Sequence, residues 1–369
     1  MTVAQDVPST RSVFEQLARE GLVDPAWADT LTGALAEQPT PTPWFVRGMV
    51  GAGAWLAAIL LVIFVAGLGF MTGAAGFIVL GLASMAAAGA ARYRFDGDFA
   101  TQMALAVSLA GQGLFIVGLF QSEVFDDFEL VLWSLIVINA ILGAVFPDKT
   151  HRFLSVALIV GPATILLYIR EVHDLLAVFG PALAALYMWL LAKEPAFVSR
   201  GWHDALTPLR SGVLFSAFGV TMMSTIYVLP QFVQEDFQFY PRPWLSTLLY
   251  GAMLLLAERR VLASVFGGAT GVFAMGVYIS TAIVVAAAWP APGMILSLLV
   301  IVIASVHGLA VYRGAGIAFL AVFTAAFFYG IDVGMLVKSA SLIATGIIVL
   351  ACRWLFLHTV AAPGEVADA

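Results

Sequence analysis

The stretch GMILSLLVIVIASVHGLAVY, residues 293–312, decides the fold class of this chain. It contains no Asp, Glu, Lys or Arg, and about 20 apolar residues in a helix match the thickness of the hydrocarbon core of a bilayer. Trp289 lies shortly before the stretch and Arg313 directly after it. Aromatic residues gather at membrane interfaces and cations gather in cytoplasmic loops. We therefore predict a transmembrane helix here, with the end at Arg313 in the cytoplasm.

The composition of the whole chain supports the same interpretation. Of the 369 residues, 62% are hydrophobic and 11% are charged, whereas soluble domains are close to half apolar and a quarter charged. A water-soluble fold could not bury so much apolar surface, so the lipid bilayer must surround most of the chain. The longest basic run is Arg259-Arg260, which disfavours nucleic acid as a partner. Cys352 is the single cysteine and excludes an intrachain disulfide.

We predict that residues 48–352 form an all-α polytopic bundle of about twelve transmembrane helices. The eighth span is short, and the ninth is long enough to tilt, to kink at Gly267-Gly268 or to include an interfacial turn. The predicted spans are 48–70, 71–91, 99–121, 130–147, 153–169, 174–192, 211–230, 244–257, 261–288, 293–312, 314–331 and 334–352.

Both ends of the chain are predicted to be cytoplasmic. Residues 1–47 are predicted to form a helical hairpin, broken between Gly21 and Pro25, and a stiff proline-rich linker. This segment is either a docking or regulatory module or a cap that aids folding and orientation, and we favour the cap. Residues 353–369 form a short cytoplasmic tail.

The distribution of Lys and Arg predicts the orientation. With the N-terminus inside and twelve spans, 14 of the 17 Lys and Arg residues fall in inside loops or at inside ends. The three on the outside are Arg170, Arg242 and Lys338. Cytoplasmic loops of membrane proteins are enriched in Lys and Arg, and one miscounted span would reverse every later loop. The bias therefore predicts an even number of spans, with both termini in the cytoplasm.

Ionisable residues within predicted spans are the first candidates for function, because burying a charge in a membrane is unfavourable. Lys338 lies about one turn inside the outer end of the last span, near Asp332. It either extends to the outer surface, which we favour, or faces the bundle and pairs with a carboxylate. His307, toward the inner half of the tenth span, is either a buried neutral histidine hydrogen-bonded to a helix neighbour, which we favour, or part of a proton relay.

Two prolines repeat one local pattern in neighbouring spans. Gly161-Pro162 is followed by Leu167-Tyr168, and Gly180-Pro181 is followed by Leu186-Tyr187 at the same separation. Proline removes a helical hydrogen bond and kinks the helix. The fifth and sixth spans therefore either border an internal cavity or carry ordinary kinks, since proline is frequent in membrane helices.

The remaining polar patterns predict no catalytic or metal site, and we expect no cofactor. The five histidines lack the i, i+4 spacing of zinc ligands, and the sequence contains neither a phosphate-binding Gly-rich loop nor a serine nucleophile elbow. Residues 170–174 are either a small polar site or a solvated hairpin tip, and we favour the tip. Four uncharged polar residues in the third and fourth spans are expected to hydrogen-bond between helices: Gln102, Ser108, Gln112 and Asn139.

Short motifs near both ends of the predicted bundle point to a family. The last two spans contain Phe327-Phe328-Tyr329-Gly330-Ile331-Asp332 and then Leu336-Val337-Lys338-Ser339, and the first begins after Trp44-Phe45-Val46-Arg47. These motifs resemble the DUF4401-type family, bacterial multi-pass inner-membrane proteins with a domain of unknown function, although this chain has Phe328-Tyr329 where many relatives have Tyr-Tyr. Residues 20–24 resemble the front of the DUF2157-type membrane family. The resemblance implies a bacterial inner-membrane location, a role for Lys338 and Ser339, and a membrane-anchored protein partner.

Three functions stay open. The first is a structural or assembly component that works with a membrane partner, which we favour slightly because polar residues are sparse in the predicted spans. The second is a transporter or permease for a small solute, with the spans kinked at Pro162 and Pro181 lining its path. The third is an intramembrane enzyme, which ranks last because no cluster of carboxylates or metal ligands lies at a predicted membrane face.

Overall fold

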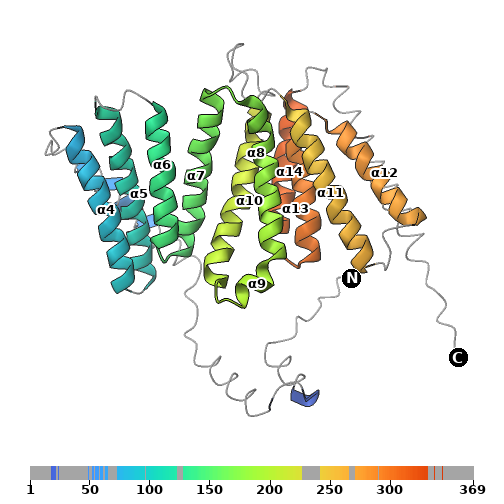
Figure 1. Cartoon of the computed structure of the whole chain (residues 1–369), viewed down its shortest axis with the longest axis horizontal. Coiled ribbons are helices and arrows are strands. Elements are labelled where there is room, and N and C mark those ends of the chain that lie inside the picture. The colour runs from blue at the N-terminus through green and yellow to red at the C-terminus, as the bar shows by residue number, and fades with distance from the viewer. Residues whose placement is uncertain are drawn as a thin grey trace.

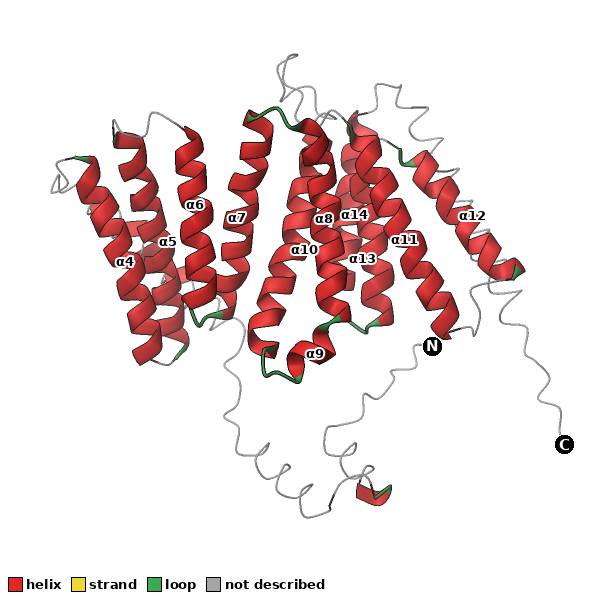
Figure 2. Cartoon of the chain, in the orientation of Figure 1, coloured by secondary structure: helices red, strands yellow, loops and turns green. Residues whose placement is uncertain are grey.

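The computed structural model of the chain describes residues 73–95, 97–122, 128–226, 242–265, 271–289 and 291–330, with scattered residues between 18 and 64 and residues 336 and 343. Every regular element in these ranges is a helix (Figure 2). The prediction of an all-α fold is therefore confirmed.

Short connections join most of the described helices. Six of them, α4 to α8 and α14, are long and apolar enough to cross a membrane, and α12 and α13 contain shorter apolar helices. The protein is therefore membrane-embedded, as its composition predicts. The helices, labelled as in Figure 1, are α4 Ala74–Arg94, α5 Asp98–Gln121, α6 Phe128–Val145, α7 Lys149–Ile169, α8 His173–Ala192, α9 Glu194–Val198, α10 His203–Ile226, α11 Pro243–Val265, α12 Val272–Ala287, α13 Pro292–Val306 and α14 Ala310–Gly330.

Ten of these helices coincide with the second to eleventh predicted spans, and the five-residue α9 lies between two of them. The first and last predicted spans, 48–70 and 334–352, lie outside the described residues apart from isolated positions. The count of twelve therefore stays a prediction, as do the terminal segments 1–47 and 353–369.

The predicted boundary between the eighth and ninth spans is wrong. The charges at 258–260 predict a loop, but α11 continues through them to Val265 and α12 begins only at Val272. The helix continues because the side chains of Arg259 and Arg260 are exposed, while the Glu258 carboxylate accepts a hydrogen bond of 2.7 Å from the Thr281 hydroxyl on α12. The three charged residues at 258–260 therefore do not end the helix, because each charge is exposed to solvent or has a hydrogen-bond partner.

The opening stretch, residues 293–312, is also not one helix. α13 ends at Val306 and α14 begins at Ala310. Between them Gly308 has a φ of 66°, and the Leu309 N–H donates to the Ala304 carbonyl at 2.8 Å. A left-handed glycine with this bond is a common helix stop, because glycine has no Cβ to oppose the conformation. Because the stretches on both sides of Gly308 are largely apolar, hydrophobicity alone does not reveal that the helix ends there. The predicted end of the span, next to Arg313, is therefore too late in the sequence.

The described helices divide into a row and a bundle (Figure 1). The row consists of α4, α5, α6 and α7, which stand side by side, and the bundle consists of α8, α10, α11, α13 and α14. α12 lies tilted at the far edge of the bundle. The main hydrophobic core lies in the bundle, where the rings of Phe218 and Phe319 stack with centroids 4.1 Å apart.

Small residues pack the row instead. A Cβ atom on Gly81 of α4 would lie 2.7 Å from the Gly111 carbonyl oxygen of α5. The two backbones are therefore in direct contact, as is common where small residues line helix interfaces in membranes. The row and the bundle meet where α7 packs on α10.

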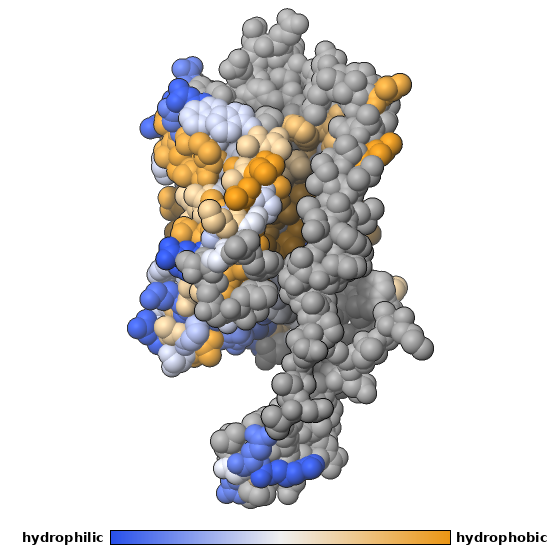
Figure 3. Space-filling model, turned by 90° about the vertical axis from the view of Figure 1, so that its right-hand side faces the viewer, coloured by the Kyte–Doolittle hydropathy of each residue, from blue (hydrophilic) through white to orange (hydrophobic). Residues whose placement is uncertain are grey.

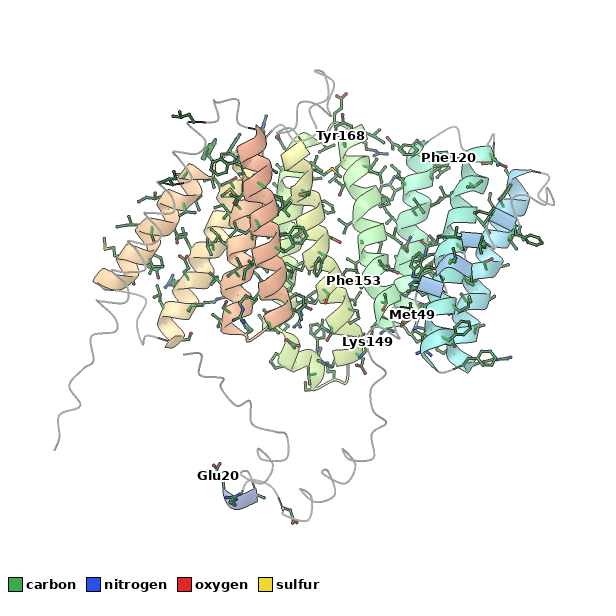
Figure 4. The ribbon with its side chains drawn as sticks, turned by 180° about the vertical axis from the view of Figure 1, so that it is seen from behind. Glu20, Met49, Phe120, Lys149, Phe153 and Tyr168 are labelled. Carbon is green, nitrogen blue, oxygen red and sulfur yellow. The ribbon has the colours of Figure 1, made fainter. Side chains whose placement is uncertain are left out.

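One end of the molecule collects most of the described cations. This arginine-rich end is where α4, α6, α8, α11 and α13 finish (Figure 1). Arg92 and Arg94 lie in the last turn of α4, Lys149 begins α7 and Arg313 lies in the first turn of α14. Figure 4 places Lys149 and Tyr168 at opposite ends of α7.

The opposite end carries the cations that were predicted outside, and both described ones are paired. Arg170 contacts Glu129 at 2.5 Å and Arg242 contacts Asp174 at 2.8 Å. Apolar residues cover the middle of the described surface and hydrophilic ones lie toward its ends (Figure 3). The charge separation along the helices thus matches the predicted pattern. The side of the membrane that each end faces stays a prediction.

Candidate functional site

Three predicted site residues, Asp332, Lys338 and Ser339, lie outside the described residues. The hypothesis of a buried pair at Lys338 stays a prediction. His307 is described, and it lies in the exposed turn that follows α13 rather than within a span. Its Nδ1 nitrogen bonds the Ile303 carbonyl at 2.9 Å. His307 therefore bonds a residue one turn earlier in α13 but is exposed rather than buried, because Gly308 ends the helix directly after it. Its functional role stays a prediction.

Pro162 and Pro181 are both buried, inside α7 and α8 respectively. Pro181 has no N–H, so it cannot donate to the carbonyl of Ala177 one turn earlier. The Ser246 hydroxyl of α11 donates to that carbonyl instead. Proline thus frees a backbone acceptor near the start of α8, and a residue in the first turn of α11 uses it.

The glycine before Pro181 allows a second polar contact. A Cβ on Gly180 would lie 2.7 Å from the Tyr250 hydroxyl and 3.1 Å from the Thr221 hydroxyl. These two hydroxyls bond each other at 2.7 Å and are buried. The predicted water-accessible cavity beside the two prolines stays a prediction, since the cavities described below are lined by other residues.

A buried polar cluster lies where α5, α6 and α7 meet, and its centre is His151 in the first turn of α7. Its Nε2 nitrogen bonds the Ser108 hydroxyl at 2.9 Å, and its Nδ1 nitrogen bonds the Ser155 hydroxyl at 3.1 Å. A neutral imidazole donates through one nitrogen and accepts through the other, so one serine donates and the other accepts. The Phe146 ring stacks on the imidazole at 4.1 Å.

The sequence placed His151 in a loop and missed this cluster. The signal that would have found it is Asp148, three residues earlier. Its carboxylate accepts a 2.8 Å hydrogen bond from the His151 N–H and caps the start of α7. An Asp at the N-cap position places the third following residue in the first helical turn.

Two amides close to this cluster lack a partner at one atom. Gln112 lies one turn from Ser108 on α5, and Asn139 lies one turn from Gly143, whose Cβ would meet Ser155 at 3.1 Å. Gln112 is 4% exposed and Asn139 is 0% exposed. Among the described residues, neither Gln112 Nε2 nor Asn139 Oδ1 has a hydrogen-bond partner. A donor and an acceptor are therefore both unsatisfied in the same part of the row.

A second buried cluster occupies the arginine-rich end of the bundle. The side chain of Arg210 is 5% exposed and contacts the Glu194 carboxylate of α9 at 2.5 Å. The guanidinium lies 5.9 Å from the centre of the Tyr312 ring, and the Tyr312 hydroxyl bonds Ser211 at 2.6 Å. The sequence predicted Arg210 in a loop, because a charge before an apolar run resembles a span boundary. The geometry is that of a structural clamp between α9, α10 and α14.

Glu258 is a third residue that the sequence assigned to a loop. One of its oxygens accepts from Thr281, as described above, and the other, Oε2, is buried with no hydrogen-bond partner among the described residues. No group of three or more His, Cys, Asp or Glu residues in the described part of the chain is placed to hold a metal ion.

Of the cavities that open between described helices, two bear on function. One of about 680 Å³ lies between α4 and α6 and is almost entirely apolar, with Leu82, Ala86, Trp133 and Val137 among its walls. The other, of about 260 Å³, lies between α8, α11 and α13 and includes Arg260 and His307 among its walls.

Comparison with known proteins agrees with the motifs at the two ends of the bundle. No curated protein and no solved structure matches the chain. The likeness of residues 20–24 to the DUF2157-type family stays a prediction. Residues 43–359 match the family described as a domain of unknown function, DUF4401. Because that match spans most of the 369 residues, the chain belongs to the DUF4401 family.

Proposed function

We propose that this protein is a transporter of the permease type for a small uncharged solute, with a path through the junction of α5, α6 and α7. The observation that carries the proposal is the pair of unsatisfied amide atoms, Gln112 Nε2 and Asn139 Oδ1. Leaving a buried donor or acceptor without a partner costs about 1–3 kcal/mol each. A purely structural helix interface gains nothing from that cost. A path that hydrogen-bonds a passing solute or water requires such groups.

The order of polar groups along the junction supports a path rather than a single site. Asp148 caps α7 at the arginine-rich end, His151 bonds Ser108 and Ser155, and the two amides lie about one turn further in. The sequence favoured an assembly role because polar residues are sparse in the spans. Folding gathers those few residues at one junction, which removes the reason for that preference.

The chemistry of the junction favours a solute with both a donor and an acceptor. The junction carries amides and hydroxyls, and the carboxylate described beside them, that of Asp148, already accepts a hydrogen bond from the His151 N–H. Among the described residues, a charged solute would find no free counter-charge beside the amides. Small amides and polyols fit this description.

An osmotic swelling assay tests the proposal. Proteoliposomes containing the full chain are mixed with a panel of small amides and polyols, and light scattering reports entry of each solute. We expect at least one solute to enter faster than in protein-free liposomes, and Asn139→Leu to slow it severalfold. Ser297→Ala is the matched control, because the Ser297 hydroxyl is buried but bonds only the Gly293 carbonyl of its own helix. Equal rates with and without protein for every solute would refute a transport role.

We also propose the topology that the charge distribution predicts: twelve spans in the bacterial inner membrane, with the arginine-rich end and both termini in the cytoplasm. Reporter fusions after Arg94 and Arg313 are expected to report a cytoplasmic location. Fusions near Asp127 and Pro292 are expected to report a periplasmic one. Two consecutive loops that report the same side would contradict the twelve-span arrangement.

An assembly role is the second candidate, and the apolar cavity of about 680 Å³ between α4 and α6 favours it. The groove suits the apolar helix of a membrane-anchored partner. A photo-crosslinking residue at Val137 is expected to capture one such protein in stoichiometric amount, and Ala86→Trp, which fills the groove, is expected to abolish capture. Crosslinks to lipid alone would exclude the partner.

A further inference from the structure

The cavity between α8, α11 and α13 lies toward the arginine-rich end. Its walls come from the last turns of those three helices, all of which finish at that end. On α11 the lining residues are Ala257, Arg260, Val261 and Ser264, which share one helix face because they are three or four residues apart. The cavity therefore lies at the predicted membrane interface rather than in the middle of the bundle.

The residues that line the cavity include one full positive charge, that of Arg260. Arg260 is exposed and forms no ion pair with any residue that the structure describes. The Nδ1 nitrogen of His307 donates to the Ile303 carbonyl at 2.9 Å, which leaves Nε2 as the atom directed elsewhere. The nearby helix ends carry only partial negative charge, which falls off within one turn. The full charge of Arg260 outweighs it, so the rim favours an anion.

The walls beyond the rim are apolar. Met188 and Leu191 of α8 face Val302 and Val306 of α13 across about 260 Å³. A free anion would leave this surface uncovered, whereas the acyl chain of a lipid would cover it. Basic pockets between transmembrane helices on the cytoplasmic side are known to hold anionic lipid headgroups.

We propose that this cavity binds an anionic phospholipid. Its phosphate contacts Arg260, and part of one acyl chain lies between α8 and α13. The positive charge of Arg260 suits a phosphate group. The apolar walls favour a phosphate that belongs to a lipid over free inorganic phosphate. This site is separate from the junction of α5, α6 and α7, so it does not depend on a transport function.

A thermal-shift titration of the purified full chain in detergent tests the site. The probes are phosphatidylglycerol, phosphatidylcholine and inorganic phosphate at equal concentrations. We expect phosphatidylglycerol to raise the melting temperature saturably and the other two to have little effect. Arg260→Gln is expected to weaken the phosphatidylglycerol response about fivefold, which is the contribution of one Arg near an anionic lipid surface.

Arg259 provides the matched control, because it is the adjacent cation, is equally exposed and does not line the cavity. Arg259→Gln is expected to leave the lipid response unchanged. Val302→Trp keeps the charges but fills the cavity, and it is expected to abolish the response. An equal response to phosphatidylcholine or to inorganic phosphate would overturn the proposal. So would equal losses in the Arg259 and Arg260 variants, since that result describes a diffuse basic surface.

Discussion

Gly161-Pro162 in α7 and Gly180-Pro181 in α8 have the same sequence pattern but different surroundings. Gly180 is buried, and a Cβ there would meet the hydroxyls of Tyr250 and Thr221. Gly161 is exposed, and a Cβ there would meet nothing within 4 Å. The repeat in the sequence is therefore not a repeat of function. In α8 the Gly-Pro pair lets side chains of neighbouring helices approach the backbone. In α7 the glycine of the pair contacts no neighbouring helix.

The difference follows from where the two helices stand. α8 lies within the bundle and contacts α10 and α11, whereas α7 joins the row to the bundle through α10. A kink contributes polar contacts only where another helix is close enough to use the freed carbonyl. Four predictions test this contrast, from the largest expected effect to the smallest.

Adding a side chain at the two glycines gives the largest contrast. Gly180→Val places new atoms against Tyr250 and Thr221, and overpacking of this kind costs about 3 kcal/mol at the upper end of its usual range. Gly161→Val meets open space and is expected to change stability by less than about 1 kcal/mol. Unfolding of both variants in mixed detergent measures the difference. Equal losses would show that the two positions are equivalent after all.

Removing the hydroxyl of Ser246 tests the carbonyl that Pro181 frees. Ser246→Ala leaves the buried Ala177 carbonyl without that donor and is expected to cost about 2 kcal/mol. In a Pro181→Ala background the new N–H bonds Ala177, so the same change is expected to cost less than about 1 kcal/mol. If the losses of stability from the two single changes simply add in the double variant, the Ser246 hydrogen bond does not depend on Pro181.

Replacing the threonine near each kink is expected to follow the same order, with the larger loss of stability beside Pro181. Thr221→Val removes the hydrogen bond to Tyr250 and is expected to cost about 1 kcal/mol. Thr164 of α7 bonds only the Val160 carbonyl of its own helix, so Thr164→Val is expected to be nearly neutral. Thermal unfolding compares the two. A larger loss at Thr164 would contradict the assignment of α8 as the more constrained helix.

The smallest effect is expected at the exposed contact between α7 and α10. Lys149 contacts Asp204 at 2.6 Å, and this hydrogen bond lowers the pKa of Asp204. Because the pKa of Asp204 is lower in the folded state than in the unfolded state, its ionised form stabilises the folded protein at pH values above the usual pKa of Asp. This stabilisation is lost as the pH falls through the pKa of the folded state. Because the pair is exposed, Lys149→Met is expected to leave the melting temperature at pH 7 unchanged. Titration followed by NMR should show the pKa of Asp204 rise toward its ordinary value. A clear destabilisation would mean that α7 depends on this pair.

Apolar periodicity and charge predicted most of the architecture. The described helices follow ten of the predicted spans, and the cations separate along them as expected. The errors have one cause. Charged residues were taken to end a helix, and uninterrupted apolar residues were taken to continue one. Glu258 and Arg210 lie inside helices because each has a partner on another helix. Gly308 ends a helix within an apolar run because of its backbone conformation.

The candidate site was predicted only in part. Ser108, Gln112 and Asn139 were identified as polar residues in spans, and the prolines as kinks. His151 was not, because the helix was predicted to begin after it and Asp148 was not recognised as the N-cap. Ser155 and Ser246 were not, because nothing in the local sequence distinguishes a serine that reaches a neighbouring helix from one that does not.

The sequence by itself determined that the chain is helical and membrane-embedded, and that it belongs to the DUF4401 family. These properties depend on hydrophobicity, helix length and short motifs, all of which are local. Only the tertiary structure decided that Gly180 is packed against neighbouring helices while Gly161 is not, and that His151 lies between two serines. It also brought Arg260 to the rim of an apolar cavity. The physical reason is that a hydrogen bond or a steric contact between helices depends on which faces meet, and that is set by the packing of the whole bundle.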